Sequence, residues 1–238
     1  MAALVPSRGS SARARSASPS GHRRERPRTE AEIAAAASSD EAAASATRGL
    51  HKTKLMARMH RAKETRTLDM GNVLDAARFN FELTELPSEV VSMFKASPLA
   101  HLWLTNNKLT SLPAGTRLLS NLVTLCVSGN KLRDIPEAVF ELPLLERLML
   151  ADNRLSGVPE GIAKLRRLAE LRLDRNDLAR FPAAVTTVRS LRRLGLTRNT
   201  IDAVPPEITR LSNLVELSLD HNRVRGVATR RLRCLRAL

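Results

Sequence analysis

The chain has 238 residues, of which 3% are aromatic and none is tyrosine. Leucine dominates residues 99–238, so any core must be built from repeated aliphatic side chains, which argues against an ordinary globular enzyme. The formal net charge of +15 makes the surface attractive to nucleic acids, membranes and acidic proteins. However, acidic residues are interspersed among the basic ones, and no nucleic-acid-binding signature accompanies them. We therefore expect a generally basic surface rather than a nucleic-acid-binding stripe.

Residues 1–50 are rich in Ala, Ser, Arg and Pro. They contain too few large apolar side chains to offset the entropy cost of ordering, so we expect a disordered basic arm. The first 24 residues hold five arginines and no acidic residue, a composition that is also typical of an organelle transit peptide. The sequence leaves both interpretations of the arm open.

Residues 51–98 predict an N-terminal helix and an irregular capping repeat. Leu55, Met56 and Met59 are at helical spacing within a basic stretch. This spacing predicts an amphipathic helix over 50–63 that packs on the first coil of the domain that follows. A membrane-surface role for the helix is the alternative. Residues 73–82 predict an irregular loop that is inserted into the capping repeat.

Residues 99–238 carry the strongest signal, a 23-residue repeat with the pattern L-x-x-L-x-L-x-x-N. The units open at Leu99, Leu122, Leu145, Leu168, Leu191 and Leu214. Their asparagines are Asn107, Asn130, Asn153, Asn176, Asn199 and Asn222. The first five units continue with an apolar residue and a proline, as in Leu112-Pro113, whereas the sixth has Val227-Ala228. We predict about six repeats, the last of them degenerate.

The spacing within each unit predicts its local structure. Alternating apolar residues suit a short strand with one buried face, and stacked strands of this kind form a parallel sheet along the inner side of a curved solenoid. The proline turns the chain onto the outer side, where pairs such as Val139 and Leu142 cover the core from short helical turns. The asparagine at position nine is expected to point inward and to satisfy backbone groups of neighbouring coils. We interpret these asparagines as a structural ladder rather than as catalytic residues.

These motifs resemble the intracellular leucine-rich repeat family, and the 23-residue L-x-x-L-P version resembles its Ras-group-related and Ras-suppressor type. The resemblance covers residues 68–227. It implies an α/β fold, a leucine-rich repeat solenoid that winds as a right-handed superhelix with a parallel sheet on its concave face. Because family members commonly act as scaffolds, the resemblance also implies a protein–protein interaction scaffold or adaptor in intracellular signalling.

The concave face is where we expect function, since side chains at positions 3, 5, 7 and 8 of each unit point away from the core. Trp and Arg are the residue types most often found as binding hot spots. The predicted partner-binding residues are Trp103, Met149, Arg147, Arg172, Arg175, Arg193 and Arg198. By the same positional rule, Thr124 and Cys126 are expected on this surface between Trp103 and Met149. We expect a protein partner with an apolar anchor and an acidic segment.

The sequence contains no catalytic motif, phosphate-binding loop or metal-ligand spacing, so we expect no enzymatic activity, no metal and no cofactor. Cys126 and Cys234 form neither a disulfide framework nor a metal cluster. These features, with the lack of a glycosylation acceptor and of an apolar run long enough to span a bilayer, favour a cytoplasmic location. An organelle, reached through the N-terminal arm, and the nucleus are the alternatives.

Two other functions remain open from the sequence. The basic arm and the arginines of the concave face could hold nucleic acid through phosphate contacts, as an accessory protein would. The chain could also be a fragment of a larger leucine-rich repeat signalling protein. Residues 228–238 are out of register with the repeat, and an uncapped last coil would self-associate. The sequence therefore predicts either a monomer or self-association through the C-terminal edge.

Overall fold

The computed structural model describes residues 52–71 and 82–225. The chain divides into two units, Met1–Ala46 and Thr47–Leu238, and all described residues belong to the second. The predicted disordered arm over 1–50 and the out-of-register segment over 228–238 lie outside the described residues. The predicted loop over 73–82 also lies outside them, except for its last residue.

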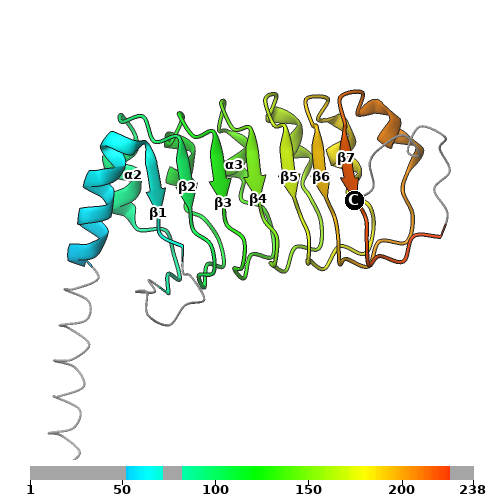
Figure 1. Cartoon of the computed structure of the whole chain (residues 1–238), viewed down its shortest axis with the longest axis horizontal. Coiled ribbons are helices and arrows are strands. Elements are labelled where there is room, and N and C mark those ends of the chain that lie inside the picture. Colours follow the sequence, from blue (N-terminus) through cyan, green and yellow to red (C-terminus); the bar gives the residue numbers. More distant parts are fainter. Residues whose placement is uncertain (1–51, 72–81, 226–238) are drawn as a thin grey trace, which may run out of the picture. The chain divides into compact units, whose positions relative to one another are not determined.

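Seven parallel strands form one sheet and pair in chain order. They are β1 (Thr67–Asp69), β2 (His101–Trp103), β3 (Thr124–Cys126), β4 (Arg147–Met149), β5 (Glu170–Arg172), β6 (Arg193–Gly195) and β7 (Glu216–Ser218). The leucine at the centre of each strand pairs with the leucine of the next, from Leu68 with Leu102 to Leu194 with Leu217. Figure 1 shows the strands side by side in this order. From β2 onward a constant 23-residue coil returns the chain to the same register each time, as predicted.

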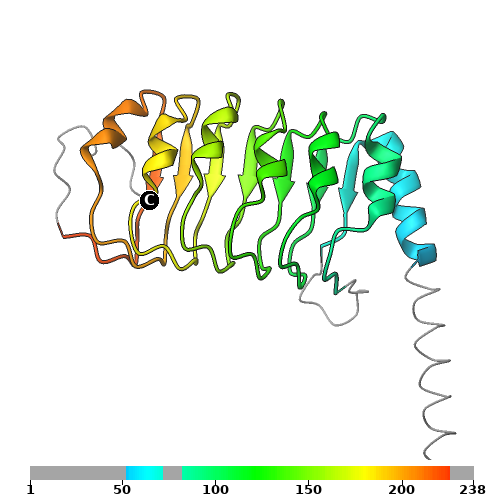
Figure 2. The ribbon, with the colours of Figure 1, turned by 180° about the vertical axis from the view of Figure 1, so that it is seen from behind.

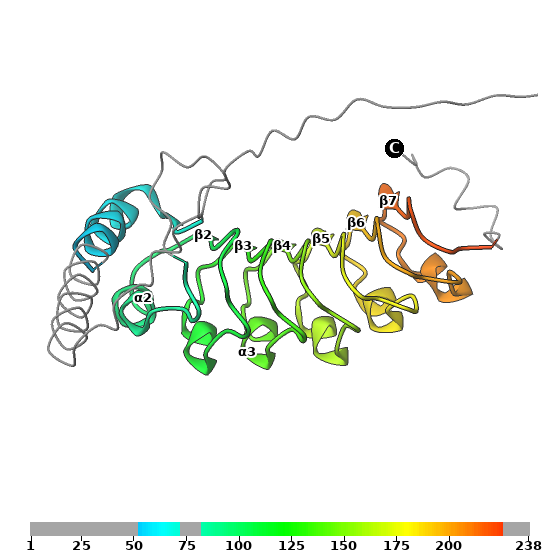
Figure 3. The same cartoon turned by 90° about the horizontal axis from the view of Figure 1, so that it is seen from below.

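Short helical elements connect the strands on the other side of the core. They are α2 (Ser88–Phe94), the 3-10 helix η1 (Ala114–Leu118), α3 (Glu137–Phe140) and the 3-10 helices η2 (Glu160–Lys164), η3 (Ala183–Thr187) and η4 (Pro206–Arg210). Each begins directly after a proline, such as Pro136 with φ −61°, because the fixed φ of proline suits the start of a helical turn. The strands line the inner side of the curve and the helical elements its outer side (Figures 2 and 3). The predicted leucine-rich solenoid is confirmed.

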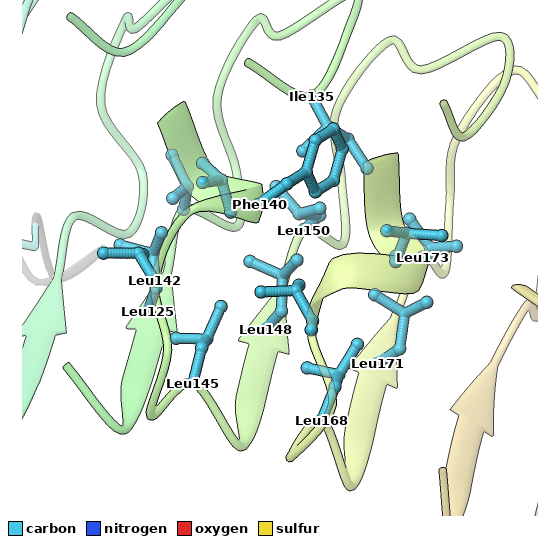
Figure 4. Close-up of a cluster of buried hydrophobic side chains, with 14 of the residues drawn as sticks. Leu125, Ile135, Phe140, Leu142, Leu145, Leu148, Leu150, Leu168, Leu171 and Leu173 are labelled. Atoms are coloured by element: carbon cyan, nitrogen blue, oxygen red, sulfur yellow. The ribbon is translucent and has the colours of Figure 1, made fainter. Parts of the chain in front are cut away.

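The core is a continuous layer of leucines between the sheet and the outer helical elements. Leu125, Leu148 and Leu171, at the centres of three successive strands, are 0% exposed. Leucines from neighbouring coils contact one another and lie beneath Phe140 of α3 (Figure 4). Each coil therefore shields the leucines of the next, which is why a solenoid of this kind is stable only as a stack.

The asparagine at position nine of each unit joins its coil to the preceding one. Asn153 accepts a hydrogen bond from the backbone N–H of Leu132 over 3.0 Å and donates to the carbonyl oxygen of Val127 over 2.9 Å. It also donates to Leu150 O within its own coil, over 3.1 Å. The equivalent bonds recur in the other units. Five of the asparagines are buried, whereas Asn222 in the last described coil is partly exposed.

A helix over residues 52–65 lies against the first coil and overlaps the predicted amphipathic helix (Figure 3). Met59 and Ala62 are buried in the common core, at 0% and 1% exposed, and Leu55 and Met56 pack against it. The Arg58 guanidinium donates to the carbonyl oxygen of Asp69 in β1 over 2.8 Å. The apolar side chains of this helix thus pack on the first coil, in the capping position that the sequence predicted.

Candidate protein-binding surface

The candidate site is the concave surface, defined by the side chains at positions 3, 5, 7 and 8 of the coils. In each strand the central leucine points into the core, so the residues on either side of it point away from the core. The concave surface therefore carries His101, Trp103, Arg147, Met149, Glu170, Arg172, Arg193 and Glu216. All seven predicted partner-binding residues lie in these strands or in the turns that follow them, and all seven are on the same face of the sheet.

The first three coils of the concave surface carry few charges. Trp103 of β2 and Met149 of β4 are partly exposed. Between them, Thr124 and Cys126 of β3 are 0% and 4% exposed, so the expectation that these two residues lie on the surface was wrong. Their side chains are small, and the larger residues of the adjoining coils cover them. The apolar part of the surface is thus formed by Trp103 and Met149.

Polar contacts hold the buried side chains of β3 in place. The Nε of Arg147 donates to Thr124 Oγ1 over 3.0 Å, so the guanidinium lies over β3. Thr105 Oγ1 lies 3.3 Å from Cys126 Sγ, and Cys126 Sγ donates to Ser128 Oγ over 3.7 Å. The contacts of Arg147 with Thr124 and of Thr105 with Cys126 join neighbouring coils, and all three fix the floor between Trp103 and Met149.

The later coils carry an ion-pair network that the sequence did not reveal. Arg172 Nε lies 3.1 Å from a carboxylate oxygen of Glu170, and Arg172 Nη2 lies 3.3 Å from Glu216. Arg193 contacts the second oxygens of the same two carboxylates over 3.6 and 3.7 Å. The four residues come from three consecutive coils, and each arginine contacts both glutamates. The two positive charges of the arginines are therefore balanced by the two negative charges of the glutamates.

Arg172 is the most enclosed member of this network. Its burial disfavours the charged form, but the hydrogen bond that Arg172 donates to Glu170 and the negative charges of Glu216, Glu170 and Asp174 outweigh that effect. The pKa of Arg172 is consequently raised above its ordinary value, and the guanidinium is always charged. Arg172 and Arg193 are thus already paired with carboxylates of this chain, and their contribution to partner binding stays a prediction.

Gly195 makes room for this packing. A Cβ at this position would collide with the carboxylate of Asp174 and with the aliphatic stem of Arg172. The Asp174 carboxylate also accepts a hydrogen bond from the backbone N–H of Thr197 over 2.8 Å. The glycine at the end of β6 thus lets the Arg172 side chain reach across the strand to Glu216 in β7.

The residue at position 8 of each coil lies in a turn with positive φ. The members are Asn106 (55°), Gly129 (68°), Asp152 (53°), Arg175 (53°), Arg198 (56°) and His221 (55°). Arg175 contacts Asp152 of the preceding coil over 3.3 Å. Within residues 52–71 and 82–225, no ion pair is formed by Arg198 or Arg147. These two of the predicted arginines keep a charge that no carboxylate balances.

A hollow of about 400 Å³ opens beside the ion-pair network. It is lined by Glu146, Arg147, Ala169, Glu170, Arg192, Arg193 and Val215. Val215 is 61% exposed, whereas most large aliphatic side chains in the described part of the chain are buried. Sequence reasoning missed this hollow because Val215, Arg192 and Ala169 occupy position 2, just before the strands. The only available signal was the small or apolar character of that position in alternate coils.

The described residues contain no group of three or more His, Cys, Asp and Glu side chains that could hold a metal ion. Nor does any helix among them have the length and hydropathy needed to cross a membrane. His101, Cys126 and Asp152 lie on adjacent coils, but the Cys126 thiol contacts only the hydroxyls of Thr105 and Ser128 in the hydrogen-bond pattern.

Comparison with known proteins agrees with this geometry. Residues 120–178 match the leucine rich repeat family model. No match was found among the curated proteins. Among solved structures, a leucine-rich repeat protein of Leptospira interrogans has a TM-score of 0.61 and 30% sequence identity, over 67% of this chain and 40% of that chain.

Two further structures share the fold. One is a plant peptide hormone receptor, RGFR1, in complex with RGF2, with a TM-score of 0.53 and 23% identity over 65% of this chain and 25% of that chain. The other is the PEPR1–AtPEP1 structure, with a TM-score of 0.50 and 29% identity over 58% of this chain and 20% of that chain. This chain spans 40% or less of the length of each of the three structures. The matched residues and the parallel sheet identify the described part of the chain as a leucine-rich repeat solenoid.

Proposed function

We propose that the chain is a protein-interaction scaffold that binds a partner on its concave surface. The observation that carries this proposal is the position of Trp103, the only tryptophan of the chain, which is partly exposed on β2 beside a low-charge strand. Leucine-rich repeat proteins typically mediate protein–protein interaction, and their concave sheets provide extended binding surfaces. A catalytic role has no comparable support in the geometry.

In this proposal Trp103 and Met149 hold an apolar anchor of the partner. Tryptophan is enriched among hot-spot residues because its large side chain loses much water-exposed surface on binding. The floor formed by Thr124 and Cys126 is fixed by hydrogen bonds. A rigid floor reduces the entropy cost of binding, because fewer side chains must be ordered when the partner docks.

The predicted arginines contribute in two different ways. Arg198 and Arg147, whose charges no carboxylate balances among the described residues, attract the acidic segment of the partner. Arg172 and Arg193 instead orient the partner through an ordered, electrically balanced surface, and Arg175 does the same beside Asp152. Of the five predicted arginines, only Arg147 and Arg198 therefore require an acidic residue of the partner, because the other three are already paired within this chain.

We further propose an intracellular signalling role, as in the Ras-group-related and Ras-suppressor type that the repeat resembles. The support is the L-x-x-L-P repeat itself and the free, buried Cys126 thiol, which suits a reducing compartment. The alternative locations, an organelle or the nucleus, are distinguished by imaging the full chain with a C-terminal fluorescent tag. Cytoplasmic fluorescence supports the proposal, and organellar fluorescence overturns it.

A photo-crosslinking experiment tests the binding proposal. The photoreactive amino acid benzoylphenylalanine replaces Trp103 in one variant and Leu118, which is 47% exposed in η1 on the outer side, in the other. Both full-length variants are expressed in the native cell and irradiated. We expect a crosslinked partner from position 103 and none from position 118, whereas the reverse pattern would overturn the proposal.

The captured partner is then purified and its affinity is measured directly. Trp103→Ala is expected to weaken binding by roughly thirtyfold, the effect of a hot-spot residue. Arg198→Glu is expected to slow association, an effect that high salt removes. Leu118→Ala is the matched control and should leave the affinity unchanged. Equal affinities for the wild type and Trp103→Ala would show that the partner binds elsewhere.

A further inference from the structure

A second, basic surface lies outside the concave one. It is formed by the loops that follow the carboxyl ends of β2, β3 and β4, at the edge of the sheet (Figure 1). Lys131, Arg133 and Arg154 lie there around a hollow of about 520 Å³, together with Thr110, Ser111, Asp134 and Pro136. None of these residues belongs to the concave surface, and no part of the proposed function uses them.

The backbone positions of the cations are fixed by hydrogen bonds between coils. Lys131 N donates to Leu109 O over 2.8 Å, and Arg154 N donates to Leu132 O over 2.8 Å. Both residues are at position 10 of consecutive coils. Each is held to the preceding coil by one of these backbone hydrogen bonds. Their side chains project from neighbouring coils and line the same hollow as Arg133, which comes two residues after Lys131.

The charges at this hollow are not balanced locally. Among residues 52–71 and 82–225, no carboxylate lies within ion-pair distance of Lys131, Arg133 or Arg154, although Asp134 lines the same hollow. This differs from the concave network, where Arg172 and Arg193 each contact two carboxylates. Neighbouring like charges repel one another, and an anion bound between them removes that repulsion.

We propose that Lys131, Arg133 and Arg154 bind a single phosphate group carried by a phosphorylated protein segment. A phosphate monoester bears a charge of about −1.5 to −2 and three acceptor oxygens, which match three cations and the nearby hydroxyls of Thr110 and Ser111. Charge-assisted hydrogen bonds from Arg and Lys to phosphate are among the strongest in proteins. A carboxylate carries a smaller charge and fewer oxygens, so it would leave one cation unmatched.

The extent of the basic edge favours one phosphate over a nucleic acid. On one side Lys108 is already paired with Glu82 over 2.9 Å. On the other side, position 10 is Asp177 in the next coil and the uncharged Thr200 in the coil after it. A nucleic acid places phosphates at short intervals along its whole length and requires a longer basic track. The cations that line the hollow come from two consecutive coils only, and such a short cluster suits an isolated phosphate.

Binding of a short synthetic peptide tests this proposal. The probe is a fluorescein-labelled peptide with one phosphoserine flanked by Gly and Ala, and fluorescence anisotropy is recorded with the full chain at 150 mM NaCl. The unphosphorylated peptide and a twin with Glu in place of phosphoserine are the ligand controls. We expect measurable binding of the phosphopeptide, competition by inorganic phosphate, and roughly tenfold weaker binding of both controls.

Matched variants locate the binding. The double variant Lys131→Gln and Arg154→Gln should weaken binding roughly tenfold to a hundredfold. Arg180→Gln removes an exposed arginine of the following coil that does not line the hollow, and it should change the affinity less than twofold. Lys131, Arg154 and Arg180 are all exposed, so circular dichroism melting is expected to be unaltered in every variant. The basic residues of the N-terminal arm are the same in every variant and cancel in the comparison.

Several outcomes would overturn the proposal. These are no detectable binding of the phosphopeptide, equal binding of its unphosphorylated twin, or equal loss in Arg180→Gln and in the double variant. A 20-nucleotide uridine oligomer provides a further comparison. Tighter binding of this RNA, lost in the double variant, would overturn the phosphopeptide assignment and identify a nucleic-acid site instead. Variants of the concave surface should leave phosphopeptide binding unchanged, which separates this site from the proposed scaffold function.

Discussion

The side chain of Asn153 accepts a hydrogen bond from the backbone N–H of Leu132, 21 residues earlier, over 3.0 Å. The bond joins two successive coils at a point where water does not reach, because Asn153 is 8% exposed. The same amide also donates to Val127 O over 2.9 Å. One asparagine therefore satisfies both a donor and an acceptor of the preceding coil, and the solenoid depends on this contact for its spacing.

Asn153→Ala is expected to lower the free energy of unfolding by about 2–3 kcal/mol, since it leaves buried backbone groups without partners. Asn222→Ala is the matched control, because Asn222 makes the equivalent bonds while partly exposed, so water can replace them. Urea denaturation followed by circular dichroism measures both variants. Equal losses would show that the burial of the asparagine does not determine its contribution.

Gly161→Ala is expected to destabilise the protein by about 1–3 kcal/mol through overpacking. A Cβ at Gly161 in η2 would overlap the ring of Phe140, which is 2% exposed and cannot move into solvent. Gly157→Ala is the control, since nothing lies within 4 Å of its added Cβ. Thermal melting of the two variants should differ clearly. Similar melting temperatures would mean that Phe140 rearranges at little cost.

Met59→Ala should destabilise the N-terminal end of the solenoid by about 2–4 kcal/mol, because Met59 is 0% exposed and its removal leaves a cavity. In a stack, each coil contacts mainly its neighbours, so the loss should be local. Hydrogen exchange of the backbone amides should become faster in β1 and stay unchanged in β6. Arg61→Ala, an exposed change in the same helix, should affect neither strand.

Arg172 and Glu216 are expected to be coupled by about 0.5–1 kcal/mol in a double-mutant cycle of alanine variants. Their side chains are 31% and 22% exposed and their charged atoms are 3.3 Å apart. Screening at 1 M NaCl should reduce the coupling, since the Debye length falls to about 3 Å. Lys164 and Glu137 form the control pair, at 3.9 Å and with exposures of 59% and 78%. Coupling of the same size in both pairs would argue against a role for burial.

Most of the fold could be predicted from the sequence because each coil places leucine, asparagine and proline at the same positions. Leucines at fixed positions require a buried face, and proline at a fixed position ends the extended segment. The parallel register, in which Leu125 lies between Leu102 and Leu148, follows from the constant coil length. The positive φ of position 8 was missed, although Asn106, Gly129 and Asp152 are residue types that tolerate it.

The candidate surface was less predictable. Position in the repeat indicates which side chains leave the core, but their exposure depends on the sizes of residues one coil away. Cys126 was expected on the surface and is 4% exposed. The hollow around Lys131 and Arg154 likewise combines residues from neighbouring coils, and its residues carry no common motif.

By itself, the sequence determined the parallel leucine-rich solenoid and the face on which Trp103 and the arginines lie, because each of these follows from spacing within one coil. Only the tertiary structure decided which of those arginines keep an unbalanced charge. Arg172 and Glu216 are 44 residues apart in the chain and belong to strands two coils apart. They are in contact because Gly195 has no side chain, so the Arg172 side chain can pass over the strand between them. Ion pairing depends on atomic distances between separate coils, and those distances exist only once the coils are stacked.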